Sequence, residues 1–202
     1  KESLAITLDA EGDDSNSGAV HEIKSGTIRQ LATIPAECSL GLFYLRNIKL
    51  AGFDLFEEYK VMGLAPYGDR ERGLREFRKI YRRLPEGQWE YTSRRCSHWE
   101  LPRVPEGSMP QEVMDFAAGL QAALEDILSH MLLHFQGVTG HEVLCAAGGV
   151  TLNCAAIGKV LASGLFKRVL VAPVAHDAGC AWGAALHETM TRQEQPRIEP
   201  PS

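Results

Sequence analysis

The amino-acid sequence predicts an α/β fold with a mixed sheet and helices packed on it. Residues 142–190 alternate short apolar runs with helical patterns, which is typical of a βαβα unit with parallel strands. Residues 4–33 show apolar runs separated by acidic and glycine-containing turns, which is typical of an antiparallel meander. Residues 111–136 carry apolar side chains at helical spacing and predict a long helix that follows Pro110.

The first part of the chain predicts three strands and a helix. The expected strands are residues 4–8, 19–23 and 27–33, with an acidic turn at 9–14 and a further turn at Gly26. Ser39 is a plausible N-cap, because its hydroxyl can accept a free amide at the start of a helix. We expect that helix to continue to about Leu50 and to end near Gly52.

The middle of the chain gives weaker patterns. Residues 57–68 predict a helical turn that leads into a Gly/Pro loop. The basic run 70–83 predicts a helix with a solvated face. Residues 84–110 hold four prolines and little periodicity, so an irregular insertion or a small hairpin is expected. The stretch 70–110 as a whole is interpreted as an irregular insertion.

The last part predicts the strands and helices of the βαβα unit. The expected strands are 142–147 and 168–172, and the expected helices are 153–163 and 177–190. Residues 191–202 are polar and hold prolines, so they predict a disordered tail or linker after a domain that comprises 1–190. The chain starts with Lys, and both ends are expected to be cuts in a longer polypeptide.

Composition excludes several classes of protein. A formal net charge of −5 over 202 residues argues against a nucleic-acid platform. No apolar run approaches the length of a membrane span. The five cysteines contain no CxxC pair, which favours buried, reduced thiols over disulfides or metal ligands. With no recognisable signal peptide, these thiols indicate the cytoplasm.

The strongest candidate site lies where two predicted strands end. The first strand stops at Gly148 and Gly149, where a ligand can approach the main chain because no Cβ stands in the way. Amides at the next helix start can bind phosphate. The second strand leads to His176 and Asp177. Since parallel strands deliver their carboxyl ends to one sheet edge, a nucleotide or metal cleft is expected there.

Several candidate residues have structural alternatives. The acidic turn that holds Asp9 and Asp13 can orient a metal or be a solvated hairpin loop. Lys60 can neutralise a phosphate or pair with Glu57 on the same helical face. Asp177 can cap a helix or ligate a divalent metal.

Histidines offer weaker signals. His176 follows a strand, but a lone histidine is more often structural. His130 and His134 have the i, i+4 spacing of two ligands on one helical face. No acidic residue of the HExxH kind accompanies them, so packing or surface positions are favoured.

Five segments, in this order, resemble the O-carbamoyltransferase family that includes nodulation, cephamycin and tobramycin enzymes. They are residues 8–13, 39–44, 58–68, 146–154 and 173–179. The most specific is Lys-Val-Met-Gly-Leu-Ala-Pro-Tyr-Gly, residues 60–68. The five segments lie within residues 4 to about 187, so the resemblance covers most of the chain.

The resemblance implies a fold of the actin/hexokinase/Hsp70 type, with residues 1–190 as the second half of a domain similar to tRNA threonylcarbamoyl-adenosine synthase. It implies ATP-dependent transfer of a carbamoyl group from carbamoyl-adenylate to a hydroxyl of a small-molecule acceptor, as in antibiotic biosynthesis. Carbamoyl phosphate would be activated by a separate adenylate-forming domain. The N-terminal half, with the paired histidines of the family's metal site, would lie outside this chain or on another chain.

The resemblance also assigns residues. Asp177 would be a ligand of a divalent metal, iron or magnesium. Lys60 would lie near the carbamoyl or phosphate end and, with His176, is a candidate catalytic residue. The ATP or carbamoyl-adenylate pocket would be lined by Asp9, Gly12, Asp13, Gly148, Gly149 and Asn153.

Two alternatives to catalysis by this family stay open. The chain can be a non-catalytic nucleotide-binding or docking module derived from the family. It can also be a threonylcarbamoyl-transfer relative acting on tRNA, although the acidic composition and residues 60–68 speak against that.

Overall fold

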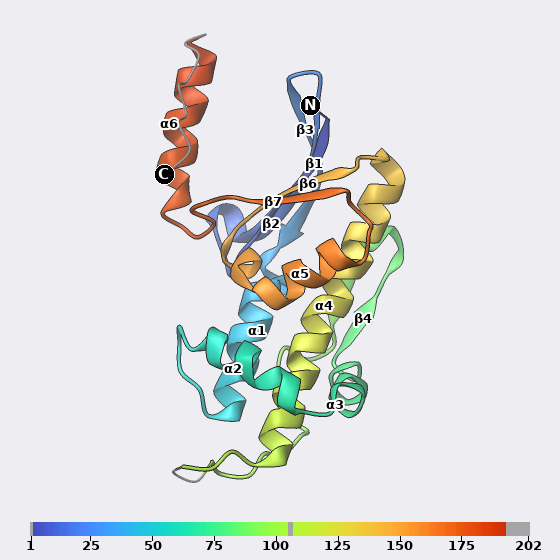
Figure 1. Ribbon diagram of the computed structural model, residues 1–202, viewed down its shortest axis with the longest axis vertical. Helices are drawn as coiled ribbons and strands as arrows, with labels where there is room; N and C mark the ends of the chain where they lie inside the picture. Colours follow the sequence, from blue (N-terminus) through green and yellow to red (C-terminus); the bar gives the residue numbers. More distant parts are fainter. Residues whose placement is uncertain (1, 105–106, 193–202) are drawn as a thin grey trace.

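The computed structural model describes residues 2–104 and 107–192 and contains a mixed five-stranded sheet (Figure 1). Its strands are β1 (Ser3–Leu8), β2 (Asn16–Lys24), β3 (Thr27–Pro35), β6 (Val143–Ala147) and β7 (Arg168–Val171). They lie in the order β3-β2-β1-β6-β7. The pairs β1–β2 and β2–β3 are antiparallel, whereas β6 is parallel to both β1 and β7. The predicted combination of a meander with a parallel βαβα unit is confirmed.

The strands bury one face of the sheet. Leu4, Ile6 and Leu8 alternate along β1 and are at most 2% exposed, whereas Thr7 between them is exposed. Ile6 is in register with Val20 on one side and with Ala146 on the other, so these buried side chains line the same face. This period of two is the reason that the segment forms a strand.

The buried face is covered by α1 (Leu40–Ile48), α4 (Gln111–Thr139) and α5 (Cys154–Ala162) (Figure 1). The Ser39 hydroxyl accepts the Leu42 amide at 3.0 Å, and Gly52 ends the following turn in the left-handed region, so both predicted ends of the first helix are confirmed. The helix α4 is buried along much of its length and ends at Gly140, with a φ of +67°.

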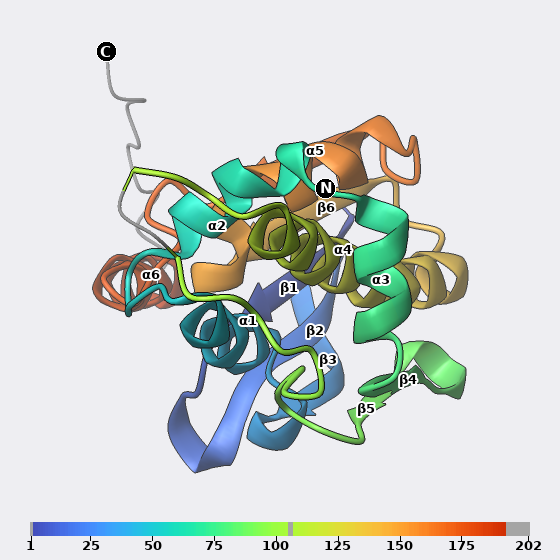
Figure 2. The ribbon, with the colours of Figure 1, turned by 90° about the horizontal axis from the view of Figure 1, so that it is seen from below.

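A second group of elements packs on α4. They are α2 (Glu58–Leu64), α3 (Arg70–Phe77), β4 (Tyr81–Arg83) and β5 (Trp89–Tyr91) (Figure 2). The glycines Gly73 and Gly119 face each other, and a Cβ on Gly73 would lie 2.5 Å from the Gly119 Cα. The two glycines therefore allow α3 to approach α4 more closely than larger residues would.

The prediction of a helix over the whole of 70–83 was wrong at its end. The helix stops at Phe77, and Tyr81 begins a strand that pairs with β5 in a small hairpin. Phe77 and Tyr81 are both buried, so the chain turns after the helix to bury a second aromatic ring against the core. The stretch 70–110 thus contributes to the hydrophobic core rather than forming only an irregular loop.

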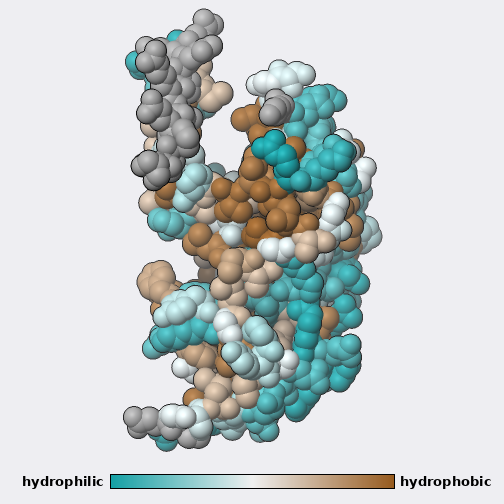
Figure 3. All heavy atoms as spheres, viewed as in Figure 1, coloured by the Kyte–Doolittle hydropathy of each residue, from teal (hydrophilic) through white to brown (hydrophobic). Residues whose placement is uncertain are grey.

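The C-terminal helix α6 (Gly179–Thr191) contains no buried residue and extends away from the rest of the protein (Figure 1). Apolar surface gathers over the sheet beside it (Figure 3). Leu170 and Val171 of the edge strand β7 are 44% and 36% exposed. The predicted tail 191–202 lies outside the described residues from position 193 onward. Within the described part of the chain, no helix has the length and apolar character that crossing a membrane requires.

Candidate functional site

The candidate site lies at the sheet edge where the parallel strands β1, β6 and β7 end. The Gly149 amide donates a hydrogen bond of 2.6 Å to Oδ2 of Asp9, which joins the loop after β6 to the loop after β1. The Gly148 amide donates a bond of 2.7 Å to the carbonyl oxygen of Ala175, in the loop after β7. The three loops therefore meet at one edge, as the parallel register requires.

The glycines at this edge permit close main-chain contact within the protein. Gly148 has a φ of +92°, and a Cβ there would collide with the Leu8 main chain. A Cβ on Gly149 would lie 3.1 Å from Oδ1 of Asp9. On the other side, Gly41 at the start of α1 lies against the Asp9 main chain, where a Cβ would be 2.8 Å from the carbonyl oxygen. We predicted that Gly148 leaves room for a ligand, but this space is occupied by β1.

Asp9 is held by main-chain amides. Its Oδ2 accepts the Gly149 amide, and its Oδ1 accepts the Ala10 amide at 2.7 Å. The Ser39 hydroxyl donates to the Asp9 carbonyl oxygen at 2.9 Å and so attaches the start of α1 to the same loop. The predicted amide site at Gly149 thus binds an oxyanion in this structure, and that oxyanion is the Asp9 carboxylate.

Gly12 and Asp13 lie farther along the same loop and are exposed. The Gly12 amide donates to the carbonyl oxygen of Asn16 at 2.7 Å, which closes the turn between β1 and β2. Among the described residues, no hydrogen bond connects either of them to the turn at Gly148. The turn brings Gly12 and Asp13 to this edge of the sheet, but no hydrogen bond among the described residues fixes the Asp13 side chain there.

Asn153 is half-buried, and its side chain is hydrogen-bonded within the protein. Its Oδ1 accepts the Ala156 amide at 2.9 Å and caps α5. Its side-chain amide also exchanges two hydrogen bonds with Gln121 of α4, at 2.9 and 3.0 Å. The oxygen and the nitrogen of the Asn153 side chain therefore both hold the loop after β6 against α4. The predicted contact of this side chain with a nucleotide would require these hydrogen bonds to break.

Gln121 lies beside the candidate site but was not predicted from the sequence. It is 3% exposed, accepts the Tyr44 hydroxyl at 3.2 Å and donates to Oε1 of Glu125 at 2.9 Å. Oε2 of the buried Glu125 is paired with Arg70 at 2.7 Å and Lys159 at 2.8 Å. The sequence does hold a signal for this pair, because Gln121 and Glu125 are polar residues four positions apart on an apolar helical face, where they can bond to each other.

Lys60 pairs with Glu57 of the preceding turn, so the structural alternative for this residue is observed. This hydrogen bond raises the pKa of the Lys60 ammonium group. The pKa of Glu57 is lowered, first by the Asp54 amide and then by Lys60. The segment nevertheless lies beside the site, because the thiol of Cys154 at the start of α5 contacts Sδ of Met62 at 3.8 Å.

His176 and Asp177 are exposed on the loop that precedes α6. Nδ1 of His176 accepts the Ala178 amide at 3.4 Å. The structural alternative for Asp177, a helix cap, is not observed: the N-cap position is Ala178, and no side chain caps this end. The chain makes its turn with main-chain bonds, in which the Cys180 amide donates to the Asp177 carbonyl oxygen at 3.0 Å.

The described residues do not form a complete metal centre. They contain no group of three or more His, Cys, Asp or Glu side chains close enough to hold an ion. His130 instead contacts the carbonyl oxygens of Leu84 and Gln88 at 2.8 and 3.0 Å, and His134 packs against Gly87. The predicted packing role of these two histidines is confirmed.

All five cysteines are free, which confirms the prediction against disulfides. The expectation that they are buried holds for Cys96 but was wrong for Cys154 and Cys180, which are exposed. Cys154 starts α5 on its outer side, and Cys180 belongs to α6, a helix with no buried residues.

The basic run 70–83 was interpreted as a solvated face. In the structure most of its cations are paired with carboxylates, such as Arg72 with Asp115 at 2.7 Å and Arg78 with Asp126 at 3.1 Å. The run therefore anchors α3 and the β4–β5 hairpin to the rest of the protein through ion pairs.

Comparison with known proteins identifies the family to which this chain is similar. The model of the carbamoyltransferase N-terminus matches residues 1–186. Nodulation protein NolNO of Sinorhizobium fredii is 45% identical over 191 residues, which cover 92% of this chain and 28% of that protein. Nodulation protein NolO of Bradyrhizobium diazoefficiens is 46% identical over 191 residues, which cover 92% of this chain and 34% of that protein.

A protein of Synechocystis described as uncharacterized is 35% identical over 164 residues, which cover 73% of this chain and 27% of that protein. The chain thus spans about a third or less of the length of these relatives. The family model covers the sheet, α1 to α5 and the three loops that meet at Asp9, Gly149 and Ala175. The resemblance found in the five sequence segments is confirmed at the level of the family, and the chain belongs to the carbamoyltransferase family.

Proposed function

We propose that this chain forms part of an ATP-dependent O-carbamoyltransferase. In this proposal, residues 1–190 are the second half of an actin-like domain, and the acceptor is a hydroxyl of a small secondary metabolite. Carbamoyl phosphate is activated as carbamoyl-adenylate by a separate adenylate-forming domain. Family membership supports the transferase class, and two relatives carry the name nodulation protein.

The observation that carries the proposal is the Asp9 carboxylate bound to the amides of Gly149 and Ala10. It demonstrates that the main chain at this edge presents donors to an oxyanion. An adenylate phosphate has the same kind of acceptor oxygens, and amides that follow a parallel strand are well suited to bind it. We therefore place the phosphate of the adenylate beside Gly149.

The proposed reaction is transfer of a carbamoyl group. The acceptor oxygen forms a bond to the carbamoyl carbon, the bond from that carbon to the phosphate oxygen breaks, AMP leaves, and the hydroxyl proton passes to a base. His176 is our candidate for the base, since it is exposed next to the same edge and a neutral imidazole can accept a proton. Lys60 is our candidate for neutralising the leaving phosphate, which requires it to exchange Glu57 for the ligand.

A divalent metal, iron or magnesium, belongs to the proposal only through Asp177. Its carboxylate is exposed and is not used as a helix cap, so it is available as one ligand. Because no three potential ligands come together in the described part of the chain, these residues alone do not complete the site, and no reaction step is assigned to the metal. Metal titration of Asp177→Ala against the unchanged chain tests this ligand.

Calorimetric titration with AMP tests the proposed edge. Gly149→Ala places a methyl group at the proposed phosphate position, 3.1 Å from Oδ1 of Asp9, so AMP affinity should fall because the methyl group takes the space that the phosphate needs. Gly158→Ala is a matched control, because a Cβ there meets nothing within 4 Å and alanine favours the helix α5. Equal AMP affinity in both variants would place the nucleotide elsewhere.

A second candidate function is a non-catalytic nucleotide-binding or docking module. The exposed apolar residues of β7 and the unpacked helix α6 favour a surface that meets another part of a larger assembly. A carbamoyl-transfer assay separates the two candidates. AMP binding without any carbamoylated acceptor, after carbamoyl-adenylate is supplied with the complementary parts of a relative, would favour the module.

A further inference from the structure

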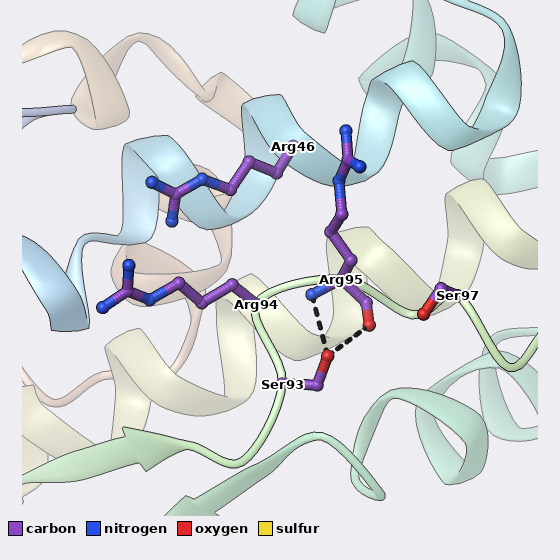
Figure 4. A pocket seen from close by; sticks show the side chains of 5 residues that line it. All are labelled: Arg46, Ser93, Arg94, Arg95 and Ser97. Atoms are coloured by element: carbon purple, nitrogen blue, oxygen red, sulfur yellow. Dashed lines mark hydrogen bonds between the residues drawn. The ribbon is translucent and has the colours of Figure 1, made fainter.

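A shallow cavity that is largely open to solvent lies at the far end of α1 from the sheet edge and is lined by three arginines and two serines. It has a volume of about 480 Å³ and is bounded by Arg46, Ser93, Arg94, Arg95 and Ser97. Figure 4 shows the Arg46 and Arg94 side chains extending in the same direction, with Arg95 turned away from that pair. No carboxylate lines this cavity.

These arginines differ from the other cations of the same region. Six Arg or Lys residues of the run 70–83 are paired with carboxylates: Arg70, Arg72, Arg78, Lys79, Arg82 and Arg83. In contrast, Arg46, Arg94 and Arg95 have no ion pair within the described part of the chain. In an acidic protein with many carboxylates available, three uncompensated guanidinium groups around one cavity create a local positive potential that attracts an anion.

The loop that carries Arg94 and Arg95 is fixed to α1. The fully buried side chain of Asn47 donates to the Arg94 carbonyl oxygen at 3.2 Å and accepts the Cys96 amide at 2.8 Å. Asn47 directly follows Arg46, so one buried residue ties both sides of the cavity together. Asn47 thus preorganises the main chain that carries Arg94 and Arg95 relative to α1.

The polar groups inside the loop also limit what the cavity can offer a ligand. The Ser93 hydroxyl is occupied, because it donates to the Arg95 carbonyl oxygen at 2.8 Å and accepts the Arg95 amide at 3.3 Å (Figure 4). The donors that remain are the guanidinium groups and the hydroxyl of Ser97, which is exposed. Planar guanidinium forks match the spacing of phosphoryl oxygens and bind them with charge-assisted hydrogen bonds.

We propose that this cavity is a binding site for a phosphate group of a small molecule, bound by Arg46 and Arg94 and further stabilised by Arg95. A doubly charged phosphate monoester matches three cations better than a single carboxylate does. A nucleic acid would need a continuous basic surface, and the neighbouring run 70–83 is already neutralised by carboxylates. The site is separate from the adenylate edge and does not depend on the proposed transferase activity.

Calorimetry with inorganic phosphate and glycerol phosphate, at low ionic strength, tests the proposal. Arg46→Gln and Arg94→Gln should each lower phosphate affinity about tenfold, since each removes charge-assisted hydrogen bonds. Arg75→Gln is the charge-matched control: this arginine is exposed, does not line the cavity and should leave the affinity unchanged. AMP is itself a phosphate monoester, so Arg94→Gln should weaken AMP binding at this cavity and leave AMP binding at the sheet edge unchanged.

Four results would overturn this inference. They are no phosphate binding by the unchanged chain, an equal loss in all three variants, acetate binding as tight as phosphate binding, and an oligonucleotide that binds far more tightly than glycerol phosphate. The second would indicate general attraction between charges, the third a carboxylate site and the fourth a polyanion surface. Circular dichroism of each variant confirms that the fold is retained.

Discussion

Replacing Asn153 with alanine asks whether this side chain serves the fold or the ligand. In the structure it caps α5 and shares two hydrogen bonds with Gln121. Loss of an N-cap costs about 1 kcal/mol. Gln121 is 3% exposed and keeps Tyr44 and Glu125 as partners, but one N–H of its side-chain amide would be left without an acceptor, which costs a further amount of about 1–3 kcal/mol. We expect Asn153→Ala to lower the free energy of unfolding by about 2–4 kcal/mol.

Urea unfolding followed by circular dichroism measures this loss. With a slope of about 2 kcal/mol per molar urea, the midpoint should fall by about 1–2 M. Asn153→Ser keeps an oxygen that can cap α5 but loses the paired amide, so its midpoint should lie between those of Asn153→Ala and the unchanged chain. The reasoning is refuted if Asn153→Ala keeps the original midpoint and loses AMP binding, because the side chain would then act on the nucleotide.

Three further changes test packing and charge. Gly73→Ala should destabilise the protein by about 1–3 kcal/mol in thermal unfolding, because the new Cβ would lie 2.5 Å from α4, whereas Gly63→Ala, with nothing within 4 Å, should not. The pKa of Asp115 is lowered: burial would raise it, but the Asp69 amide, Gln111 and Arg72 together outweigh burial. Its contribution to stability is therefore complete above the unfolded value of 3.8 and is lost as pH falls through the lower folded value, so Asp115→Asn should destabilise at pH 7 but not at strongly acidic pH in urea titrations. Glu57→Gln should bring the raised pKa of Lys60 back toward 10.5 in an NMR titration, and an unchanged pKa would contradict the role of that pair.

The elements that could be predicted are those whose secondary structure is determined by a local pattern of apolar and polar side chains. The strand β1 follows from the alternation of Leu4, Ile6 and Leu8 with smaller or polar residues. The helix α4 follows from a long stripe of apolar residues at helical spacing. The common edge of β6 and β7 follows from their parallel direction, which the alternating pattern of 142–190 already indicated, whereas the parallel pairing of β1 with β6 was not predicted.

The parts that could not be predicted depend on partners far away in the sequence. The basic run ends its helix at Phe77 because the next residues gain more from burial in a hairpin than from another helical turn. The Asn153 side chain faces α4 because Gln121, on α4, provides a matched amide. The uncapped start of α6 follows from main-chain turn geometry, which neither Asp177 nor its neighbours reveal as a pattern.

The bond between Asp9 and Gly149 has a consequence for ligand binding. A phosphate that approaches the Gly149 amide meets the Asp9 carboxylate, which already occupies it at 2.6 Å. Two unit charges about 4 Å apart repel by about 1 kcal/mol in bulk water and by about 4 kcal/mol near a protein surface. The carboxylate therefore weakens binding of any negatively charged ligand at the same amide.

Asp9→Asn removes this charge while retaining the shape of the side chain. Asparagine also has one acceptor oxygen instead of two, so one of the amides of Gly149 and Ala10 becomes available to the ligand. In the presence of EDTA, AMP should bind Asp9→Asn at least about fivefold more tightly than the unchanged chain, which corresponds to about 1 kcal/mol. Calorimetric titration measures the difference.

Asp13→Asn is the matched control, since Asp13 is exposed on the same loop and has no hydrogen bond to the turn at Gly148. Its effect on AMP affinity should be smaller, because solvent screens an exposed charge. Weaker AMP binding by Asp9→Asn in EDTA would contradict the argument. Asp9 would then hold the nucleotide directly, as an acceptor for its hydroxyl or amino groups, and the phosphate would have to lie away from Gly149.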